Sequence, residues 1–326
     1  MIWARLPETA SAVWMHGVAE AATPAVICAE MARASARLHV CLTGTLKSAE
    51  TLAAHLESFH AHFSGSPEGA PHVNVLPEPG DFEPGDPRRF ERYCDRLSAL
   101  GALLEAPERR RPQVLLTTPN GLLAETPPPA HLRAQRLTLR PGDVLDFRSF
   151  AERLAREFGY ANEPVCETPG QFTVRGGLID VYPLNAAAPV RIDCFGDEIE
   201  SLRTFDPTTQ RTEAEVPEVT LTAYIDPGDG AASEVGRTPW GARERFSVVN
   251  YLPKRTHWWV IEPGKLERDA PDTFSFPENL PSTPRSFKGV LEARADAGDH
   301  WHGLGELEHE SGLFENAATV RAVDSE

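Results

Sequence analysis

The chain has 326 residues, enough for two domains of roughly 150 residues each, and its 41% hydrophobic and 25% charged residues exclude a disordered or fibrous protein. Lys and Arg number 32 against 48 Asp and Glu, so the net charge is 32 − 48 = −16. Because clustered basic residues supply most of the affinity for a phosphate backbone, we expect no direct binding to nucleic acid.

The first third of the chain alternates short apolar runs with segments of helical periodicity. Strands are predicted over residues 12–18, 38–42, 73–76 and 114–117. Helices are predicted over residues 24–36, from Thr45 to residue 59, and from Asp86 to residue 104, where Thr45 and Asp86 are suitable N-caps. Strands that alternate with helices favour a parallel sheet covered by helices.

Three consecutive prolines, residues 127–129, mark the start of a second folding unit. A short strand is predicted over residues 137–139, and Asp146 is a suitable cap for a helix over residues 147–158 that ends at Gly159. Strands joined by short turns, with no helix between them, are predicted over residues 171–175, 178–183, 190–195 and 198–205. This order indicates an antiparallel meander with one helix, an α+β domain.

Residues 246–252 and 258–261 are apolar enough to be strands that rejoin the first sheet, which makes the meander an insertion. From residue 269 onward the chain is polar and its aromatic residues are isolated, so irregular structure is expected there. The predicted organisation is an α/β parallel-sheet domain, an inserted α+β domain and an irregular C-terminal segment, formed by residues 1–126 with 218–268, by 127–217, and by 269–326.

The turn between the first predicted strand and helix stands where α/β proteins bind phosphate, but it lacks the groups for that task. A phosphate-binding loop needs a second glycine, a lysine and a hydroxyl residue. After Gly17 these places hold Ala22, Thr23 and Pro24, and Glu20 adds a negative charge. We therefore expect neither a nucleotide cofactor nor catalysis at this loop.

Other common sites also lack support in the sequence. The five cysteines are scattered and form no C-x-x-C pair, which argues against a disulfide framework and a zinc site. No run of 18 uncharged apolar residues or signal peptide is visible, so a cytoplasmic protein without membrane contact is expected. Two histidine groups without cysteine or carboxylate ligands at zinc spacing are expected on the surface, with no metal: His55, His60 and His62, and His300, His302 and His309.

The strand over residues 190–195 carries the pattern most suggestive of function. Because side chains alternate between the faces of a strand, Arg191, Asp193 and Phe195 share one face, opposite an apolar face that can receive a helix. Arg175 and Arg203 are expected on neighbouring strands. Arginine with an exposed aromatic residue is typical of protein-interface anchors, but a solvated charge pattern with Phe195 tucked under a loop fits equally well.

The inserted segment resembles a known family. The sequences FTVRGGLIDVYP, PVRIDCFGDEIESLR and FDPTTQR, at residues 172–183, 189–203 and 205–211, are similar to the UvrB-like N-terminal module of transcription-repair coupling factors (Mfd), and more distantly to UvrB. Weaker similarity extends over most of residues 10–265. UvrB keeps a phosphate loop and a tyrosine-rich hairpin, whereas this chain has Ala22-Thr23-Pro24 in the loop and no tyrosine in residues 72–88, so the Mfd module fits better.

The resemblance implies a degenerate P-loop, helicase-like domain whose insert recruits UvrA, the damage-recognition ATPase. By motif, the residues implied to contact UvrA are Arg175, Arg191 and Phe195, and Arg191→Ala is expected to abolish most binding with the fold intact. A separate chain with a translocase motor or an RNA-polymerase-binding domain is a further expected partner. Two alternatives stay open: a free-standing UvrA antagonist, and a fragment of an ATP-dependent repair helicase.

Overall fold

The structure is a computed structural model that forms two compact units. It describes residues 11–33, 38–64, 71–80, 82, 86–106, 111–224, 245–269, 290, 294, 297–306 and 318–321. Residues 1–126 and 244–326 belong to the first unit, and residues 127–243 to the second. Within the described residues, no helix has the length and apolar character needed to span a membrane.

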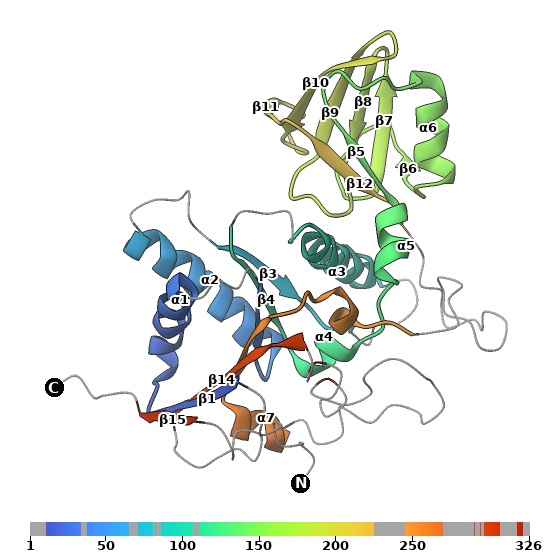
Figure 1. The fold of residues 1–326 in the computed structure, drawn as a ribbon. Coiled ribbons are helices and arrows are strands. Elements are labelled where there is room, and N and C mark those ends of the chain that lie inside the picture. Colours follow the sequence, from blue (N-terminus) through green and yellow to red (C-terminus); the bar gives the residue numbers. More distant parts are fainter. Residues whose placement is uncertain are drawn as a thin grey trace. The chain divides into compact units, whose positions relative to one another are not determined.

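The first unit is built on a seven-stranded sheet in which every described strand pair is parallel (Figure 1). Its spatial order is β15-β1-β14-β13-β2-β4-β3. The parallel sheet predicted from the alternating pattern is therefore confirmed. The strands are β1 (Ser11–His16), β2 (Leu38–Leu42), β3 (His72–Leu76), β4 (Gln113–Thr117), β13 (His257–Ile261), β14 (His300–Gly305) and β15 (Ala318–Arg321).

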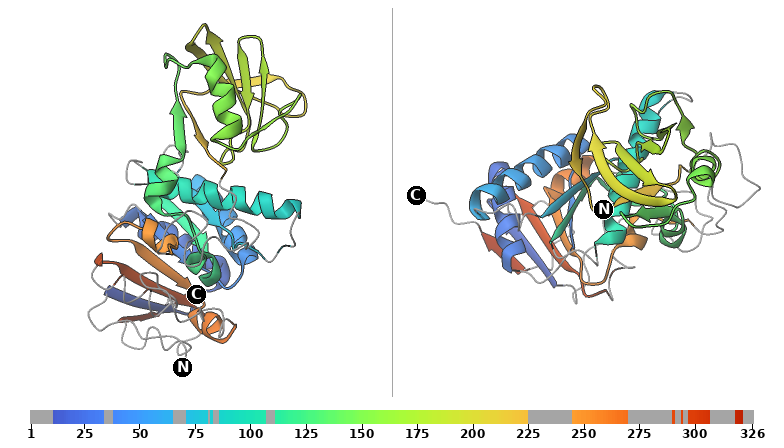
Figure 2. Two further views of the ribbon diagram at one scale, coloured as in Figure 1. Left: turned by 90° about the vertical axis from the view of Figure 1, so that its right-hand side faces the viewer. Right: turned by 90° about the horizontal axis from the view of Figure 1, so that it is seen from above.

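Helices flank this sheet (Figures 1 and 2). Asp86 caps α3 through the amide of Arg88, and the Thr45 hydroxyl accepts from the amide of Ser48 at the start of α2, as predicted. The core on the α1 and α2 side includes Ile27, Leu56 and Trp259. The helices are α1 (Thr23–Arg33), α2 (Leu46–Ser64), α3 (Pro87–Glu105), α4 (Pro119–Leu123) and α7 (Pro263–Asp269), with 3-10 turns η1 (Glu20–Ala22) and η3 (Val248–Tyr251).

Two predictions for the first unit were wrong. Residues 246–252 are not a strand but contain η3, because the amide of Ser247 donates to the Asn250 side chain in a capping box that favours helical turns. The segment from residue 269 onward, expected to be irregular, contributes β15 and also β14, which lies between β1 and β13. Glycines weaken the strand pattern of β14, so the sequence does not reveal this strand. Gly305 is nevertheless needed for packing, because an added Cβ there would lie only 2.7 Å from the Trp14 ring.

The second unit is the predicted meander with one longer helix. Its six-stranded sheet has the order β11-β10-β9-β8-β7-β6, antiparallel except for β6 with β7. A separate pair, β5 with β12, carries the unit beyond the boundary expected at residue 217. The strands are β5 (Arg136–Leu139), β6 (Ala161–Asn162), β7 (Gln171–Arg175), β8 (Leu178–Val181), β9 (Val190–Phe195), β10 (Glu198–Phe205), β11 (Thr212–Glu215) and β12 (Val219–Thr222); the helices are α5 (Pro129–Ala134) and α6 (Phe147–Arg156).

The helix α6 lies beside the six-stranded sheet (Figures 1 and 2). The Asp146 carboxylate caps α6 by accepting from the amides of Arg148 and Ser149, which also lowers the pKa of Asp146. Phe150 and Leu154 of the helix are buried, as is Ile192 of β9. One face of the sheet therefore belongs to the core of the unit.

Candidate functional site

The strand β9 presents the predicted polar face. Val190 and Ile192 are buried, whereas Arg191 and Asp193 are only partly buried, and Phe195 at the end of the strand is 84% exposed. The interpretation in which Phe195 lies under a loop is therefore wrong. The face of the sheet that carries Arg191, Asp193 and Phe195 is called the outer face below.

Arg191 lies on the outer face, but its guanidinium already has a partner. Its Nε and Nη2 donate to the two carboxylate oxygens of Asp180, at 2.7 Å and 2.9 Å. The guanidinium carbon also lies 4.9 Å from the centroid of the Phe205 ring, a cation–π contact. The hydrogen bonds to Asp180 raise the pKa of Arg191, which stays charged. The bidentate geometry expected toward a partner protein is thus used inside the module.

Arg203 and Arg175 occupy more exposed positions. Arg203 stands opposite Arg191 in the sheet register and donates to Asp193 at 2.8 Å. Arg175 is exposed and donates one bond, from Nη2 to the carbonyl oxygen of Pro164 at 2.8 Å. The turn after Arg175 requires glycine, because Gly176 has φ of 61° and a Cβ at Gly177 would approach the Cys194 carbonyl to 3.1 Å.

The sheet register brings the three predicted contact residues onto one face. Arg175 pairs with Leu178 of β8, and Leu178 pairs with Asp193 of β9. Because paired residues share a face and alternate residues of β9 do too, Arg175, Arg191 and Phe195 all lie on the outer face. Of these, Arg191 is the least accessible, with 16% of its side chain exposed.

A second exposed apolar residue, Val144, was not predicted from the sequence; it is 82% exposed. Glu198 pairs with Phe195 on one side and forms a bridge with Val144 on the other, so the three residues form one row across the sheet. We call this row the Phe195–Val144 patch. The only sequence signal for Val144 is an apolar residue in the turn before the Asp146 cap.

Backbone hydrogen bonds hold the Phe195–Val144 patch in place. The amide of Gly142 donates to the Ile199 carbonyl at 2.8 Å, and the amide of Ile199 donates to the Asp143 carbonyl at 2.9 Å. The Asp197 carbonyl accepts from Leu145. Both apolar side chains therefore stand on a fixed backbone rather than on a free loop.

The loop from Gly17 to Pro24 is closed by bonds within the chain. The amides of Gly17 and Val18 donate to the carbonyls of Glu306 and Gly305, and those of Ala22 and Thr23 donate within the 3-10 turn η1. Pro24 has no amide to offer. A phosphate cradle needs several backbone amides that point at the ligand, and four amides of this loop bond within the chain instead.

The histidines after residue 256 form a cluster on β13 and β14. The ring centroid of His257 lies 4.7 Å from that of His300 and 5.7 Å from that of His302. His302 is buried, so its assignment to the surface was wrong; His55 is exposed, whereas the side chains of His60 and His62, and His309, lie outside the described residues. Within the described part of the chain, no group of three or more potential ligands has a geometry that could hold a metal.

Desolvation by burial lowers the pKa of both His257 and His302 to about 4. The positive charge of His300 adds to this effect, while Glu30 and Asp299 oppose it at His257. Both rings are therefore neutral at pH 7. His257 and His302 therefore belong to the core of the first unit, whereas His300 is exposed, as expected.

Comparison with known proteins assigns the second unit. Residues 137–224, which hold all of the outer face, match the family model described as the UvrB interaction domain. These residues form an Mfd-like UvrB interaction module. The module therefore carries Arg175, Arg191 and the Phe195–Val144 patch on its outer face.

Curated relatives that match part of the chain include transcription-repair-coupling factors of several bacteria. The protein of Myxococcus xanthus is 41% identical over 122 residues, 37% of this chain and 10% of the relative. That of Escherichia coli is 31% identical over 205 residues, 58% and 17% respectively, and that of Haemophilus influenzae 34% over 168 residues, 51% and 14%. The matched segments thus span between a tenth and about a sixth of the relatives' length.

Proposed function

We propose that the UvrB interaction module of this chain binds UvrA and that the chain recruits it, without catalysis of its own, to link stalled transcription to nucleotide excision repair. The observation that carries the proposal is the 84% exposure of Phe195 on a fixed backbone, inside the segment that matches the interaction family. Packing within a single chain does not explain why the Phe195 side chain is exposed to water. An aromatic residue beside arginines is typical of the few residues that dominate binding energy.

The contact has an apolar centre and a charged border. Burial of Phe195 against a partner contributes roughly 2 kcal/mol from apolar area, and Val144 in the same row extends the apolar surface. Arg175 is exposed and keeps further N–H groups for a carboxylate on UvrA. Arg191 contributes chiefly by holding β8 and β9 in register through Asp180, and so positions Phe195.

The proposed absence of catalysis is supported by Ala22, Thr23 and Pro24, which stand where a phosphate loop needs glycine, lysine and a hydroxyl residue. The amides of Gly17, Val18, Ala22 and Thr23, which bond within the chain, support it further. Nucleotide titration tests this point, because an ATP-dependent helicase fragment binds ATP at micromolar concentration. The proposal includes one further partner, a separate chain with a translocase motor or an RNA-polymerase-binding domain. The net charge of −16 supports contact with proteins rather than with DNA.

The decisive experiment measures binding of purified UvrA to the full chain by biolayer interferometry. Phe195→Ala is expected to weaken binding about tenfold or more, as for other central aromatic anchors. Val165→Ala is the matched control, because Val165 is an exposed apolar residue of the same unit outside the patch. The affinity of this variant for UvrA is expected to stay unchanged. Undiminished binding by Phe195→Ala refutes the site.

A further inference from the structure

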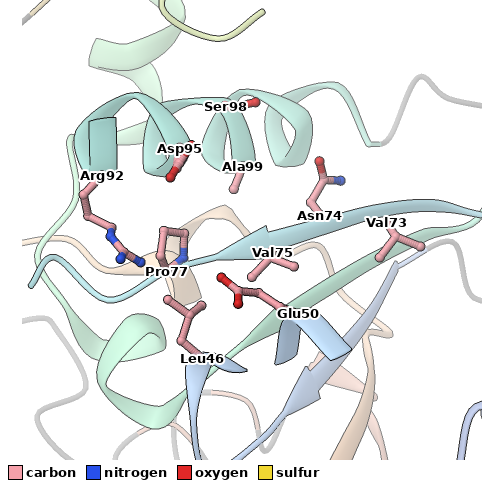
Figure 3. Close-up of a pocket in the computed structure, with 10 residues that line it drawn as sticks. All are labelled: Leu46, Glu50, Val73, Asn74, Val75, Pro77, Arg92, Asp95, Ser98 and Ala99. Carbon is pink, nitrogen blue, oxygen red and sulfur yellow. The ribbon is translucent and has the colours of Figure 1, made fainter. Parts of the chain in front are cut away.

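The free edge of the parallel sheet of the first unit lies in a groove. Strand β3 is last in the described order of the sheet, with β4 on its other side. The side chains of Val73 and Val75 pack on the α1 and α2 side, and α3 packs against β3 from the opposite face. Figure 3 shows the resulting pocket, which has a volume of about 320 Å³ and is lined by Leu46, Glu50, Val73, Asn74, Val75, Pro77, Arg92, Asp95, Ser98 and Ala99.

The backbone of β3 offers hydrogen-bonding groups to this groove. The amide of His72 donates to the Pro112 carbonyl beside β4, and the Leu76 carbonyl accepts from the Thr117 hydroxyl on the same side. Because successive residues of a strand alternate their backbone direction, the N–H and C=O groups of Val73 and Val75 point away from β4. In the described part of the chain, no hydrogen bond reaches these four groups.

The two walls of the groove bring negative charge. Glu50 comes from α2 and Asp95 from α3, on opposite sides of β3 (Figure 3). Burial raises the pKa of Asp95, the negative charges of Glu91 and Glu50 raise it further, and Arg92 opposes them. Among the residues that line the pocket, Glu50 and Asp95 against Arg92 give a net charge of 1 − 2 = −1, and a basic group brought there relieves the repulsion between the carboxylates.

We propose that this groove binds an extended, basic segment of a partner protein, which adds to the sheet as a strand beside β3. The outward N–H and C=O groups of Val73 and Val75 supply the backbone pairing. Since side chains of the added strand alternate between faces, two consecutive basic residues reach the α2 wall at Glu50 and the α3 wall at Asp95. The site lies in the first unit and does not depend on UvrA binding by the second.

The test uses the full chain and a fluorescein-labelled peptide, acetyl-Thr-Val-Lys-Arg-Val-Thr-amide, followed by fluorescence anisotropy. Saturable binding is expected, and the double variant Glu50→Gln with Asp95→Asn weakens it about fivefold, the effect of two partly exposed ion pairs. The peptide with Glu-Glu in place of Lys-Arg is expected not to bind. Hydrogen exchange of the chain is expected to slow at the amides of Val73 and Val75 when the basic peptide is present.

A double control variant, Glu20→Gln with Glu213→Gln, removes two negative charges at exposed positions away from the groove and leaves peptide affinity unchanged; Glu20 follows β1, which is not adjacent to β3 in the sheet. Equal weakening by this control means that the peptide responds only to net charge and overturns the proposal. The proposal is also overturned when no saturable binding occurs, or when the amides of Val73 and Val75 exchange at the same rate with and without the peptide.

Discussion

Arg191 donates from Nε and Nη2 to the two carboxylate oxygens of Asp180, whose side chain is 2% exposed. Arg203, which pairs with Arg191 in the sheet, donates a single bond to Asp193, and these side chains are 33% and 28% exposed. The two pairs involve the same residue types and β9 in both cases. The two ion pairs differ in burial and in geometry, so variants of the two arginines compare the effect of these properties on stability.

Arg191→Ala is expected to destabilise the UvrB interaction module by about 3 kcal/mol, because it leaves the Asp180 carboxylate buried without its cation. Arg203→Ala costs less than about 1 kcal/mol, since its pair is open to solvent. Hydrogen exchange of the β8 and β9 amides in the full chain measures both effects. Equal losses of stability in the two variants contradict the structural role given to Arg191. In that case, a loss of UvrA binding in Arg191→Ala is explained by direct contact of Arg191 with UvrA.

Phe195→Ala and Val144→Ala are expected to change the free energy of unfolding by no more than about 0.5 kcal/mol, because both side chains are more than four-fifths exposed. Phe172→Ala in the same unit is the contrast: Phe172 is 1% exposed, and its truncation costs about 3 to 5 kcal/mol. Urea unfolding followed by far-ultraviolet circular dichroism compares them. A large loss in Phe195→Ala shows that Phe195 packs within the molecule.

The first unit is expected to lose stability as the pH falls from 6.5 to 4. The pKa of His257 and His302 is about 4 in the folded chain, against an ordinary value near 6.5, so between these values the unfolded chain binds more protons than the folded one. The contribution of the two neutral histidines to the free energy of unfolding is fully present above pH 6.5. Protonation of each histidine lowers this free energy by roughly 2 to 3 kcal/mol by pH 4.

Urea unfolding followed by tryptophan fluorescence at several pH values measures this slope. His302→Phe keeps an aromatic ring against Trp259, whose ring lies 4.3 Å from that of His302, and removes one titrating group. Its slope is expected to be about half that of the parent chain. A pH-independent free energy of unfolding between 6.5 and 4 rules out the neutral, desolvated state of these histidines.

A chain truncated after residue 268, at the boundary that the sequence suggested, is expected not to form a stable first unit. Truncation removes β14 from between β1 and β13, together with Asp299, which accepts hydrogen bonds from the Trp258 indole and from the Arg294 guanidinium. The exposed strand edges favour aggregation. Size-exclusion chromatography checks this outcome, and a monomeric, cooperatively folding truncated chain contradicts it.

Local patterns in the sequence were sufficient for the four central strands of the second unit, β7 to β10, and for α6. Alternation along residues 190–195 separated Ile192 from Arg191 and placed Phe195 on the outer face, because a strand's side chains alternate whatever its neighbours are. Glycine turns between successive strands then fixed the antiparallel order, since adjacent strands joined by tight turns pair with each other. The motifs at residues 172–211 also carried the family resemblance.

The tertiary structure alone decided which groups meet across long separations in the chain. The position of β14 between β1 and β13 and the bridge that joins Val144 to the row of Phe195 are both non-local. Local propensity does not specify such pairings, because they depend on which strands lie adjacent and in what register. The sequence by itself therefore determined the residue types on each face, and packing determined which of them stay free to bind a partner.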